Sequence, residues 1–206
     1  MAVTGFLIAG ICAFSCLPAH AAQQEAWRKR IDKDGLIVHT RRVEGSPILE
    51  YKGHMTVKVP MEQVIALYED VQQLPKWFYQ CVDAKVLNAP DAMHKVIYFA
   101  LHLPWPVAER DVVFEQDKAV DAATHAVSYT FTVLPDQLPP KAGRIRMVAL
   151  KSLWQFTPLP DGRTEVYFQQ HSDPGGSIPT FVVNKLVVDI PFNSLKNFRR
   201  LLTGNK

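Results

Sequence analysis

The residues best spaced for catalysis are the consecutive His171, Ser172 and Asp173. A histidine, a serine and an aspartate can act together as base, nucleophile and orienting acid in hydrolysis. Residues two apart on a strand share a face, so His171 and Asp173 would lie side by side. The triplet leads directly into a Pro-Gly-Gly turn, which need not keep Ser172 near the imidazole. We therefore treat an enzyme as an alternative function and not as the first one.

The remaining residues that could do chemistry do not form a recognisable motif. The other histidines after residue 21 are scattered, at positions 39, 54, 94, 102 and 125. They show neither an H-E-x-x-H motif nor a Cys-His spacing typical of a metal site, so we expect no metal ion and no cofactor. Cys81 could be a nucleophile, but we expect a small buried hydrophobic residue beside Trp77 and Val82.

Composition limits the possible classes of protein. Of the 206 residues 48% are apolar and 21% are charged, as in an ordinary globular domain. The formal net charge is only +3, and no basic cluster alternates with aromatic residues. Nucleic acid therefore has little electrostatic reason to bind. The length after residue 21 favours one domain, 22–206, large enough for a core and a cavity.

The first 21 residues contain no Asp, Glu, Lys or Arg. An apolar run over 3–17 leads to Pro18 and then to an A-x-A pattern ending at Ala21, as at a signal peptidase site. We expect residues 1–21 to be a secretory signal peptide, with an uncleaved N-terminal anchor as the alternative. The missing basic residues at its start indicate a true start codon upstream. After cleavage Cys81 is the lone cysteine, so no internal disulfide can form.

The mature chain begins with a segment of mixed pattern. In 22–32, Trp27 and Ile31 are one helical turn apart, which predicts a short helix. Two runs rich in β-branched and aromatic residues follow over 36–43 and 46–59, after an Asp-Gly turn signal, and predict strands.

Two helices and a long series of strands are expected next. Pro60 suits a first helical turn, and apolar residues at helical spacing predict a helix over 61–72. Pro75 should then separate a second short helix that carries Trp77, Phe78 and Cys81. Strands are predicted over 85–90, 94–103, 112–120, 125–133, 144–150, 152–159 and 164–171, with a proline-rich loop over 134–143.

The chain closes with a helix expected over 181–202, which is apolar around much of its circumference. Ser177 is a candidate N-cap, and Pro179 is tolerated in the first turn. A surface helix needs only a single apolar stripe. An antiparallel series of strands that ends in one helix predicts that the sheet curls around this helix, and the wide apolar surface needs a further explanation. Pro191 should kink it, either to let one end lift or only to bend it around the sheet.

From Trp27 to Leu202 the chain resembles the START family of lipid-transfer domains, in particular its exported bacterial members. The matching segments, in order, are "DGLIVHTRRVEGSPILEYKG", "ALYEDVQQLPKWFYQC", "PWPVAERDVVF", "GRIRM" and "LWQFTPLPDGRTEVYFQQHSDPGGSIPTFVVN" with the closing helix. The resemblance implies an α+β helix-grip fold: a curved antiparallel sheet around a long C-terminal helix, with a hydrophobic tunnel for one lipid. It implies no catalytic machinery, although related cup-shaped folds host aromatic cyclases.

Alternation along the strands and spacing on the helix select the side chains expected to line such a tunnel. They are Val112, Phe114, Gln116, Tyr129, Phe131, Val166, Phe168, Val183, Leu186, Val187 and Ile190, with Arg146 as a further polar candidate. Plain core packing is the alternative for each of the strand and helix candidates, and an exposed strand arginine is the alternative for Arg146. Sterol-carrying relatives place a basic residue where this chain has Gln116. This difference weakens the case for a sterol and leaves phospholipids, fatty acids and other apolar molecules as candidate ligands.

Arg110 and Asp111 resemble an Arg-Asp pair of the family at a strand start. We expect a structural charge pair that fixes the loop beside Trp105, with contact to the ligand as the alternative. Taken together, the sequence predicts a monomeric periplasmic protein that binds one lipid, fatty acid or sterol-like molecule. We expect it to carry or shield this ligand, with transient membrane contact and no nucleic acid partner. A sensor or adaptor whose bound lipid alters a protein interface is a further alternative.

Overall fold

The computed structural model describes residues 25–105, 107–176 and 178–204. The strands are β1 (Arg28–Lys33), β2 (Leu36–Val43), β3 (Ser46–Val57), β4 (Cys81–Asn88), β5 (His94–Leu101), β6 (Glu109–Val120), β7 (Val127–Val133), β8 (Arg144–Arg146), β9 (Ala149–Pro158) and β10 (Thr164–Asp173). The helices are α1 (Met61–Glu69), α2 (Leu74–Trp77) and α3 (Thr180–Thr203), with a 3₁₀ turn at Val71–Gln73. The expected signal peptide lies outside the described residues.

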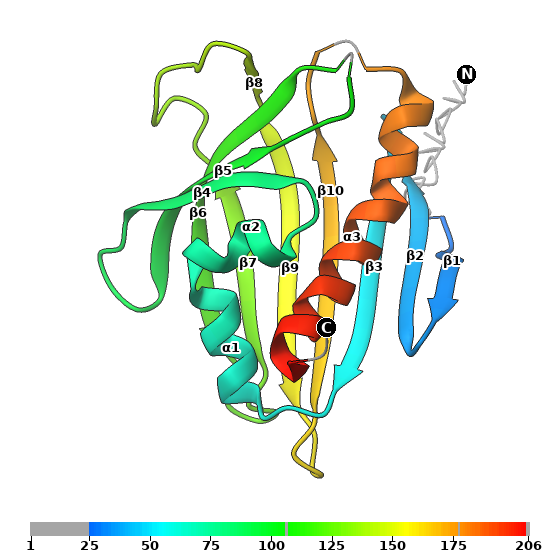
Figure 1. Ribbon diagram of the computed structural model, residues 1–206, viewed down its shortest axis with the longest axis vertical. Coiled ribbons are helices and arrows are strands. Elements are labelled where there is room, and N and C mark those ends of the chain that lie inside the picture. The colour runs from blue at the N-terminus through cyan, green and yellow to red at the C-terminus, as the bar shows by residue number, and fades with distance from the viewer. Residues whose placement is uncertain (1–24, 106, 177, 205–206) are drawn as a thin grey trace, which may run out of the picture.

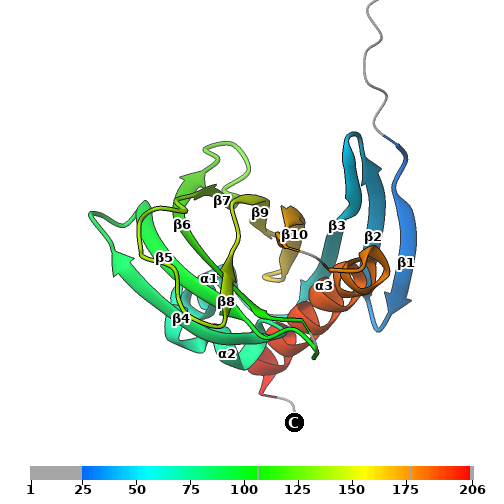
Figure 2. The ribbon, with the colours of Figure 1, turned by 90° about the horizontal axis from the view of Figure 1, so that it is seen from above.

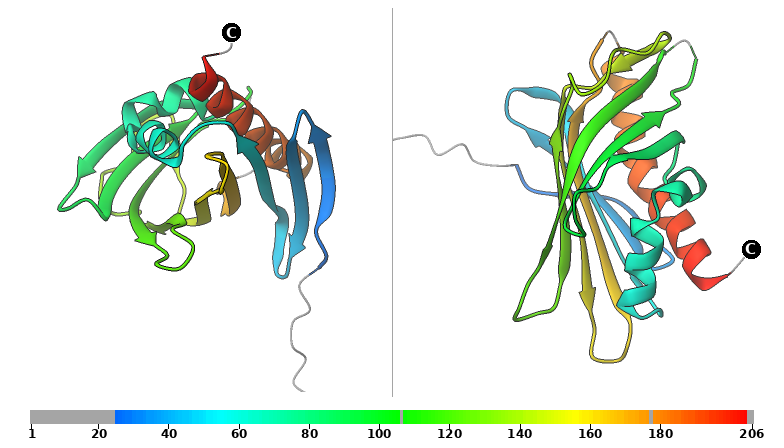
Figure 3. Two further views of the ribbon diagram at one scale, coloured as in Figure 1. Left: turned by 90° about the horizontal axis from the view of Figure 1, so that it is seen from below. Right: turned by 90° about the vertical axis from the view of Figure 1, so that its left-hand side faces the viewer.

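The strands form an antiparallel sheet with the order β1-β2-β3-β10-β9-β7-β6-β5-β4. The last strand therefore pairs with the third, and only the short β8 departs from the pattern, since it pairs in parallel with β6. Helices α1, α2 and α3 lie on one face of the sheet (Figure 1; Figure 3, right). Seen from above, the sheet curls and α3 crosses its open side (Figure 2). This architecture confirms the expected helix-grip fold.

The expected helix over 22–32 is wrong, because Arg28–Lys33 form β1. A two-residue turn with positive φ at Asp34 and Gly35 folds this strand back onto β2, as is usual for tight hairpins. The four-residue spacing of Trp27 and Ile31 fits a helix, but so short an isolated helix is marginal in water. Pairing with β2 instead gives the segment regular backbone hydrogen bonds.

Pro75 does not separate two helices as expected. It lies in the first turn of α2, where its missing N–H leaves no hydrogen bond unmade. The break comes earlier, at Asp70, whose side chain accepts a hydrogen bond from the backbone N–H of Gln72 and begins the 3₁₀ turn. Phe78 and Cys81, expected on the second helix, follow α2, and Cys81 begins β4.

Helix α3 runs unbroken for 24 residues through Pro191, a length of about 36 Å. Pro179 occupies its N-cap position and no side chain caps it. Ser177, the expected cap, is outside the described residues. The helix packs on β2, β3 and α2.

The two halves of α3 have different surroundings. In the C-terminal half, Leu195 and Phe198 are fully buried, and the Phe198 and Trp77 ring centroids are 4.7 Å apart. Further rings complete this aromatic cluster, namely Tyr68, Tyr129, Trp154, Phe156 and Phe168. In the N-terminal half, apolar side chains such as Val183 and Val187 line cavities. The wide apolar surface of α3 thus serves both a packed core and a hollow.

Gly53 of β3 lets α3 lie directly against the sheet. A Cβ atom at this position would be 2.7 Å from Leu195 Cδ1 and 3.3 Å from Pro191 Cβ. Both atoms belong to α3, so the absence of a side chain at residue 53 sets the distance between helix and sheet.

Gly53→Ala is therefore expected to lower the free energy of unfolding by about 1–3 kcal/mol, because the helix must shift to admit the methyl group. Urea unfolding followed by tryptophan fluorescence measures the change. Thr56→Ala, at an exposed position of the same strand, is the control and should change it by less than about 0.5 kcal/mol. Equal effects of the two substitutions would contradict the close approach.

Candidate functional site

Two apolar cavities lie between α3 and the curved sheet. The first, of about 70 Å³, is enclosed by the α1–α2 segment, by β5, β6 and β9, and by Ile190 of α3. The second, of about 60 Å³, lies between β3, β10 and the N-terminal half of α3. Most of the side chains around both are aliphatic or aromatic, as in sites for apolar small molecules.

The two cavities adjoin, because Leu101, Met147, Gln170 and Ile190 line both. They lie where the resemblance implies a single tunnel. A volume of about 10–15 Å³ measured in this way admits one water molecule. The two spaces therefore admit a short segment of acyl chain, and a whole phospholipid requires their walls to move apart.

The wall of the first cavity also contains polar side chains. Gln116 of β6 and Ser152 of β9 line it and are 7% and 8% exposed. Within the described part of the chain, neither side chain forms a hydrogen bond. Buried amides and hydroxyls are normally hydrogen-bonded in folded proteins. The pair is therefore available to a polar group that enters the cavity.

Two buried donors beside the cavities also have no hydrogen-bond partner among the described residues. They are the hydroxyl of Tyr51, which lines the second cavity, and the indole N–H of Trp77, which lines the first. Burial raises the pKa of the Tyr51 hydroxyl well above its ordinary value, so it keeps its proton. Both groups add polar character to a space that is otherwise apolar.

The structure brings most of the predicted lining residues to the cavities. Val112, Phe114, Gln116, Phe131 and Ile190 line the first, and Val183, Leu186, Val187 and Ile190 line the second. Tyr129, Arg146, Val166 and Phe168 line neither. The ring of Phe168 stacks on Trp154 with 4.0 Å between centroids, and the Tyr129 hydroxyl donates to Glu69. Tyr129, Val166 and Phe168 are therefore part of the packed core and do not face the cavities.

Several lining residues were not anticipated from the sequence. They are Tyr68, Val71, Leu74, Trp77, Phe78, Ile97, Phe99, Leu101, Met147, Leu150, Ser152, Trp154 and Gln170 around the first cavity, and Ile48, Leu49, Tyr51, Leu103, Arg110, Ser172, Pro174 and Ile178 around the second. In β5, the alternation of Ile97, Phe99 and Leu101 could have identified them as lining residues. However, the residues between them are apolar too, and Tyr98 and Ala100 are also buried, so the sequence does not indicate which face of β5 points inward.

Arg110 and Asp111 do not form the expected charge pair. Adjacent residues on a strand point to opposite faces, and the two side chains have separate partners. Asp111, 1% exposed, pairs with Arg146 through two hydrogen bonds of 2.8 and 3.1 Å. The same guanidinium donates to the carbonyls of Pro135 and Leu138. Arg146 therefore anchors the proline-rich loop and is not an exposed strand arginine.

Arg110 forms hydrogen bonds with the β5–β6 loop and with the β10–α3 loop, at the end of the molecule where α3 begins. It donates to the carbonyls of Pro174 (3.0 Å) and Gly175 (2.8 Å) ahead of α3, and to that of Ala108 beside the loop of Trp105. The expected role in fixing this loop is therefore correct, but backbone carbonyls are the partners and Asp111 is not.

The triplet at 171–173 is not joined into a catalytic unit. The His171 Nε2 atom lies 3.1 Å from Ser46 Oγ, the Ser172 hydroxyl accepts from Gln170, and the Asp173 carboxylate accepts from the N–H of Gly175. Among the residues that the structure describes, no group of three or more His, Cys, Asp or Glu side chains could hold a metal ion. In the same residues no helix has the length and hydrophobicity needed to cross a bilayer.

Comparison with known proteins places this fold in a family. The profile of the START domain matches residues 19–206. The chain belongs to the START family. An uncharacterized protein of Pseudomonas aeruginosa is 36% identical over 180 residues, covering 86% of this chain and 87% of that protein. The phosphatidylcholine transfer protein of Rattus norvegicus is 22% identical over 162 residues, covering 77% and 75%.

A solved structure shows the same arrangement. The STAR-related lipid transfer protein of Xanthomonas axonopodis superposes with a TM-score of 0.79 at 32% identity, covering 87% of this chain and 99% of that one. A START domain implies the binding of a lipid or another hydrophobic ligand. The two cavities are the spaces that this START domain offers beneath α3.

Cys81 is buried at the start of β4, as expected. Burial raises the pKa of its thiol to about 12, whereas a nucleophilic cysteine has a lowered pKa. The folded protein should therefore react slowly with Ellman's reagent at about pH 8, near the ordinary thiol pKa, and rapidly in urea. Fast reaction of the folded protein would contradict the burial.

The same shift gives a pH dependence of stability. The folded pKa of Cys81 lies above the ordinary value of 9.0, so its contribution to stability is complete below about pH 9 and is lost as the pH rises toward 12. Urea unfolding of wild type and Cys81→Ala across this range measures it. The variant should show the smaller decrease in stability, and identical slopes would count against the raised pKa.

Proposed function

We propose that this protein binds one amphipathic hydrophobic ligand between α3 and the sheet and shields it from water in the periplasm. The observation that carries the proposal is the pair of adjoining apolar cavities beneath α3 in a START fold. Burial of apolar ligand surface contributes roughly 25 cal/mol per Å². An acyl chain can therefore be held without any charged contact.

The N-terminal half of α3 is the wall that moves to admit the ligand. Val183 and Leu186 contact the cavity, whereas Leu195 and Phe198 are fixed in the aromatic cluster. A hydrogen bond of 3.2 Å from the Leu49 N–H to Asn184 Oδ1 joins this half of the helix to β3. Outward displacement of the half-helix would join the two cavities and leave the packed core intact.

The ligand carries a hydrogen-bonding group as well as an apolar chain. Gln116 and Ser152 are neutral, buried and without partners among the described residues, which favours an ester, hydroxyl or amide over a charged head at this point. The rat relative is named for phosphatidylcholine transfer, and a phospholipid has this combination of groups. A fatty acid or another lipid fits the same description.

Location and chemistry complete the proposal. The hydrophobic start of the chain, with its A-x-A pattern, supports export to the periplasm. We favour binding without chemical conversion, because His171, Ser172 and Asp173 bond to other groups and not to one another.

One end of the molecule suits brief contact with a membrane. Trp105 is 92% exposed and Phe181, in the first turn of α3, is 77% exposed. Trp105 belongs to the β5–β6 loop, and Phe181 comes shortly after the β10–α3 loop. The two loops lie together at this end (Figure 1; Figure 3, right). Aromatic side chains favour the interface between lipid headgroups and acyl chains. Contact there would bring the second cavity to the bilayer.

Leu186→Trp tests the ligand site. The indole should fill the second cavity and weaken uptake of a fluorescent fatty acid by about tenfold or more, as expected for an overpacked site. Lys185→Trp adds the same side chain at an exposed position of the helix and should bind as wild type does. Fluorescence titration and native mass spectrometry measure the loading. Equal loading of both variants, or no uptake by wild type, would refute the site.

Transfer between vesicles tests the carrier role. Trp105→Ser combined with Phe181→Ser should slow donor-to-acceptor transfer by roughly tenfold, because two apolar side chains no longer enter the bilayer surface. Equilibrium loading should stay unchanged. Val82→Ser with Val86→Ser, at exposed positions of β4, is the control. A wild-type protein that binds lipid without transferring it would be a sensor, and one that releases an altered lipid would be an enzyme.

A further inference from the structure

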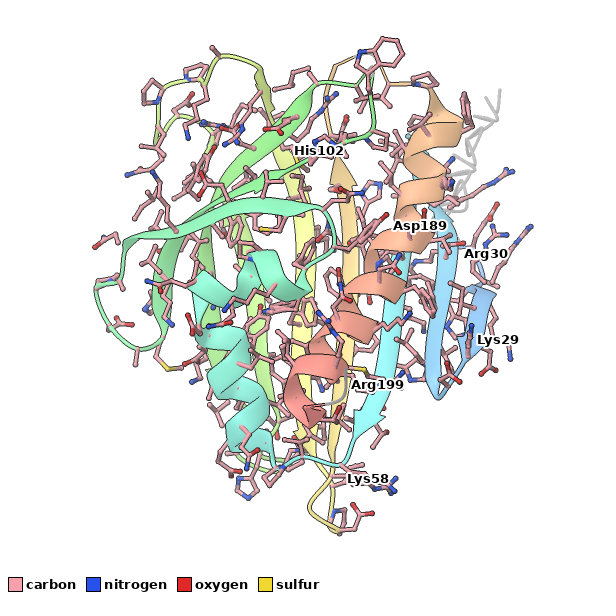
Figure 4. All side chains as sticks on the ribbon, in the orientation of Figure 1. Lys29, Arg30, Lys58, His102, Asp189 and Arg199 are labelled. Carbon is pink, nitrogen blue, oxygen red and sulfur yellow. The ribbon has the colours of Figure 1, made fainter. Side chains whose placement is uncertain are left out.

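A groove lined by arginines lies at the edge of the sheet, apart from the two interior cavities. Its volume is about 380 Å³. Arg28 and Arg30 of β1 and Arg41 and Arg42 of β2 contribute to its wall, with Asn184 of α3 on the other side. Figure 4 shows Arg30 at the edge formed by β1. None of these four arginines lines either interior cavity.

Irregular strand pairing brings the four arginines together. The register of β1 against β2 shifts at Arg30, and that of β2 against β3 shifts at Arg42. Such irregularities re-aim side chains that regular alternation would send to opposite faces. Arg41 and Arg42 are consecutive, and yet both line the groove.

Two of the four side chains are held in place by the protein itself. The Nε of Arg41 donates to Glu50 at 2.5 Å, and its guanidinium lies 4.3 Å from the ring centroid of Trp27. The Nε of Arg30 donates to the hydroxyl of Thr40 at 2.8 Å. These contacts orient the groups before any ligand arrives, which lowers the entropy cost of binding.

The positive charge of the groove is not balanced by the described residues around it. Within that part of the chain the ion pairs of β1 and β2 are Lys29–Asp32 and Arg41–Glu50. Arg28, Arg30 and Arg42 therefore have no carboxylate at ion-pair distance there. Glu25 is the single acidic residue in the wall of the groove. Three like charges in one concave surface attract an anion.

The chemistry of the wall indicates which anion fits. A guanidinium is a planar fork that binds the oxygens of phosphate through paired hydrogen bonds, and four arginine side chains line this groove. We propose that the groove binds a phosphate group, carried by a lipid headgroup or by a soluble phosphate compound. Leu49 lines both the groove and the second cavity, and the Leu49–Asn184 hydrogen bond closes the helix onto β3 between them. The site is therefore separate from the interior, and it stands independently of the lipid bound there.

The test compares two double variants of the full mature chain. Arg28→Gln with Arg42→Gln removes two groove charges, and neither side chain has an ion pair or hydrogen bond within the described residues. Lys29→Gln with Lys33→Gln removes the same charge from exposed positions of β1 outside the groove. Thermal unfolding and fluorescent fatty acid uptake should be the same in both, which separates this test from that of the interior site.

Two probes distinguish the sources of phosphate. Inorganic phosphate is titrated while the arginine Nε–Hε resonances are followed by NMR. Vesicles of phosphatidylcholine, with and without phosphatidylglycerol, are tested by sedimentation at low salt. At about 1 kcal/mol per basic residue near an anionic surface, the arginine variant should bind the mixed vesicles roughly 30-fold more weakly.

The outcomes distinguish a specific phosphate-binding site from general electrostatic attraction by positive charge. Binding of inorganic phosphate that the arginine variant loses and the lysine variant keeps supports a site for a soluble phosphate compound. The same difference with the mixed vesicles alone supports a site for lipid headgroups. Equal losses in the two variants, or no binding of either probe by wild type, would overturn the proposal.

Discussion

The approach of α3 to the backbone of β3 at Gly53 is the contact on which the interior depends. An antiparallel sheet that curls leaves an apolar concave face, and α3 has to cover it. At Gly53 no side chain separates helix and sheet. Toward the C-terminus of α3 the space is filled by aromatic rings, including that of Phe198. Toward its N-terminus the sheet and helix leave the two cavities. One helix therefore both completes a solid core and covers a hollow.

Arginines serve two opposite purposes in this fold. Arg110 is buried and Arg146 is half-buried, and their donors are used by backbone carbonyls and by Asp111. They hold together the loops around the end where α3 begins. At the sheet edge, by contrast, arginines such as Arg28 and Arg42 face a groove without carboxylate partners among the described residues. The first pair stabilises structure, and the second set remains available to bind.

The sequence predicted features that depend on local patterns and missed those that depend on tertiary position. Strand alternation and helical spacing located most of the sheet and α3, because both are periodic in the chain itself. Alternation also identified inward faces, but it does not say how far along a strand a side chain lies relative to α3. Phe168 was therefore expected at the cavity and lies in the aromatic cluster. The Arg146–Asp111 pair joins β8 to β6, and no local signal indicates it. The edge strand β1 was predicted as a helix from the four-residue spacing of Trp27 and Ile31, because its mostly exposed residues show no alternation that would indicate a strand.

The position of β10 beside β3 has a consequence for how the protein acquires its structure. The pairing joins Thr164 to Val57, so the middle of the sheet consists of strands from opposite parts of the chain. Contacts between distant residues form slowly, since a long loop must close first. A nascent chain that has not yet produced β10 and α3 has no means of closing its sheet. The order of the strands thus delays completion of the sheet until synthesis is nearly finished, so folding of this domain depends on its last third being present.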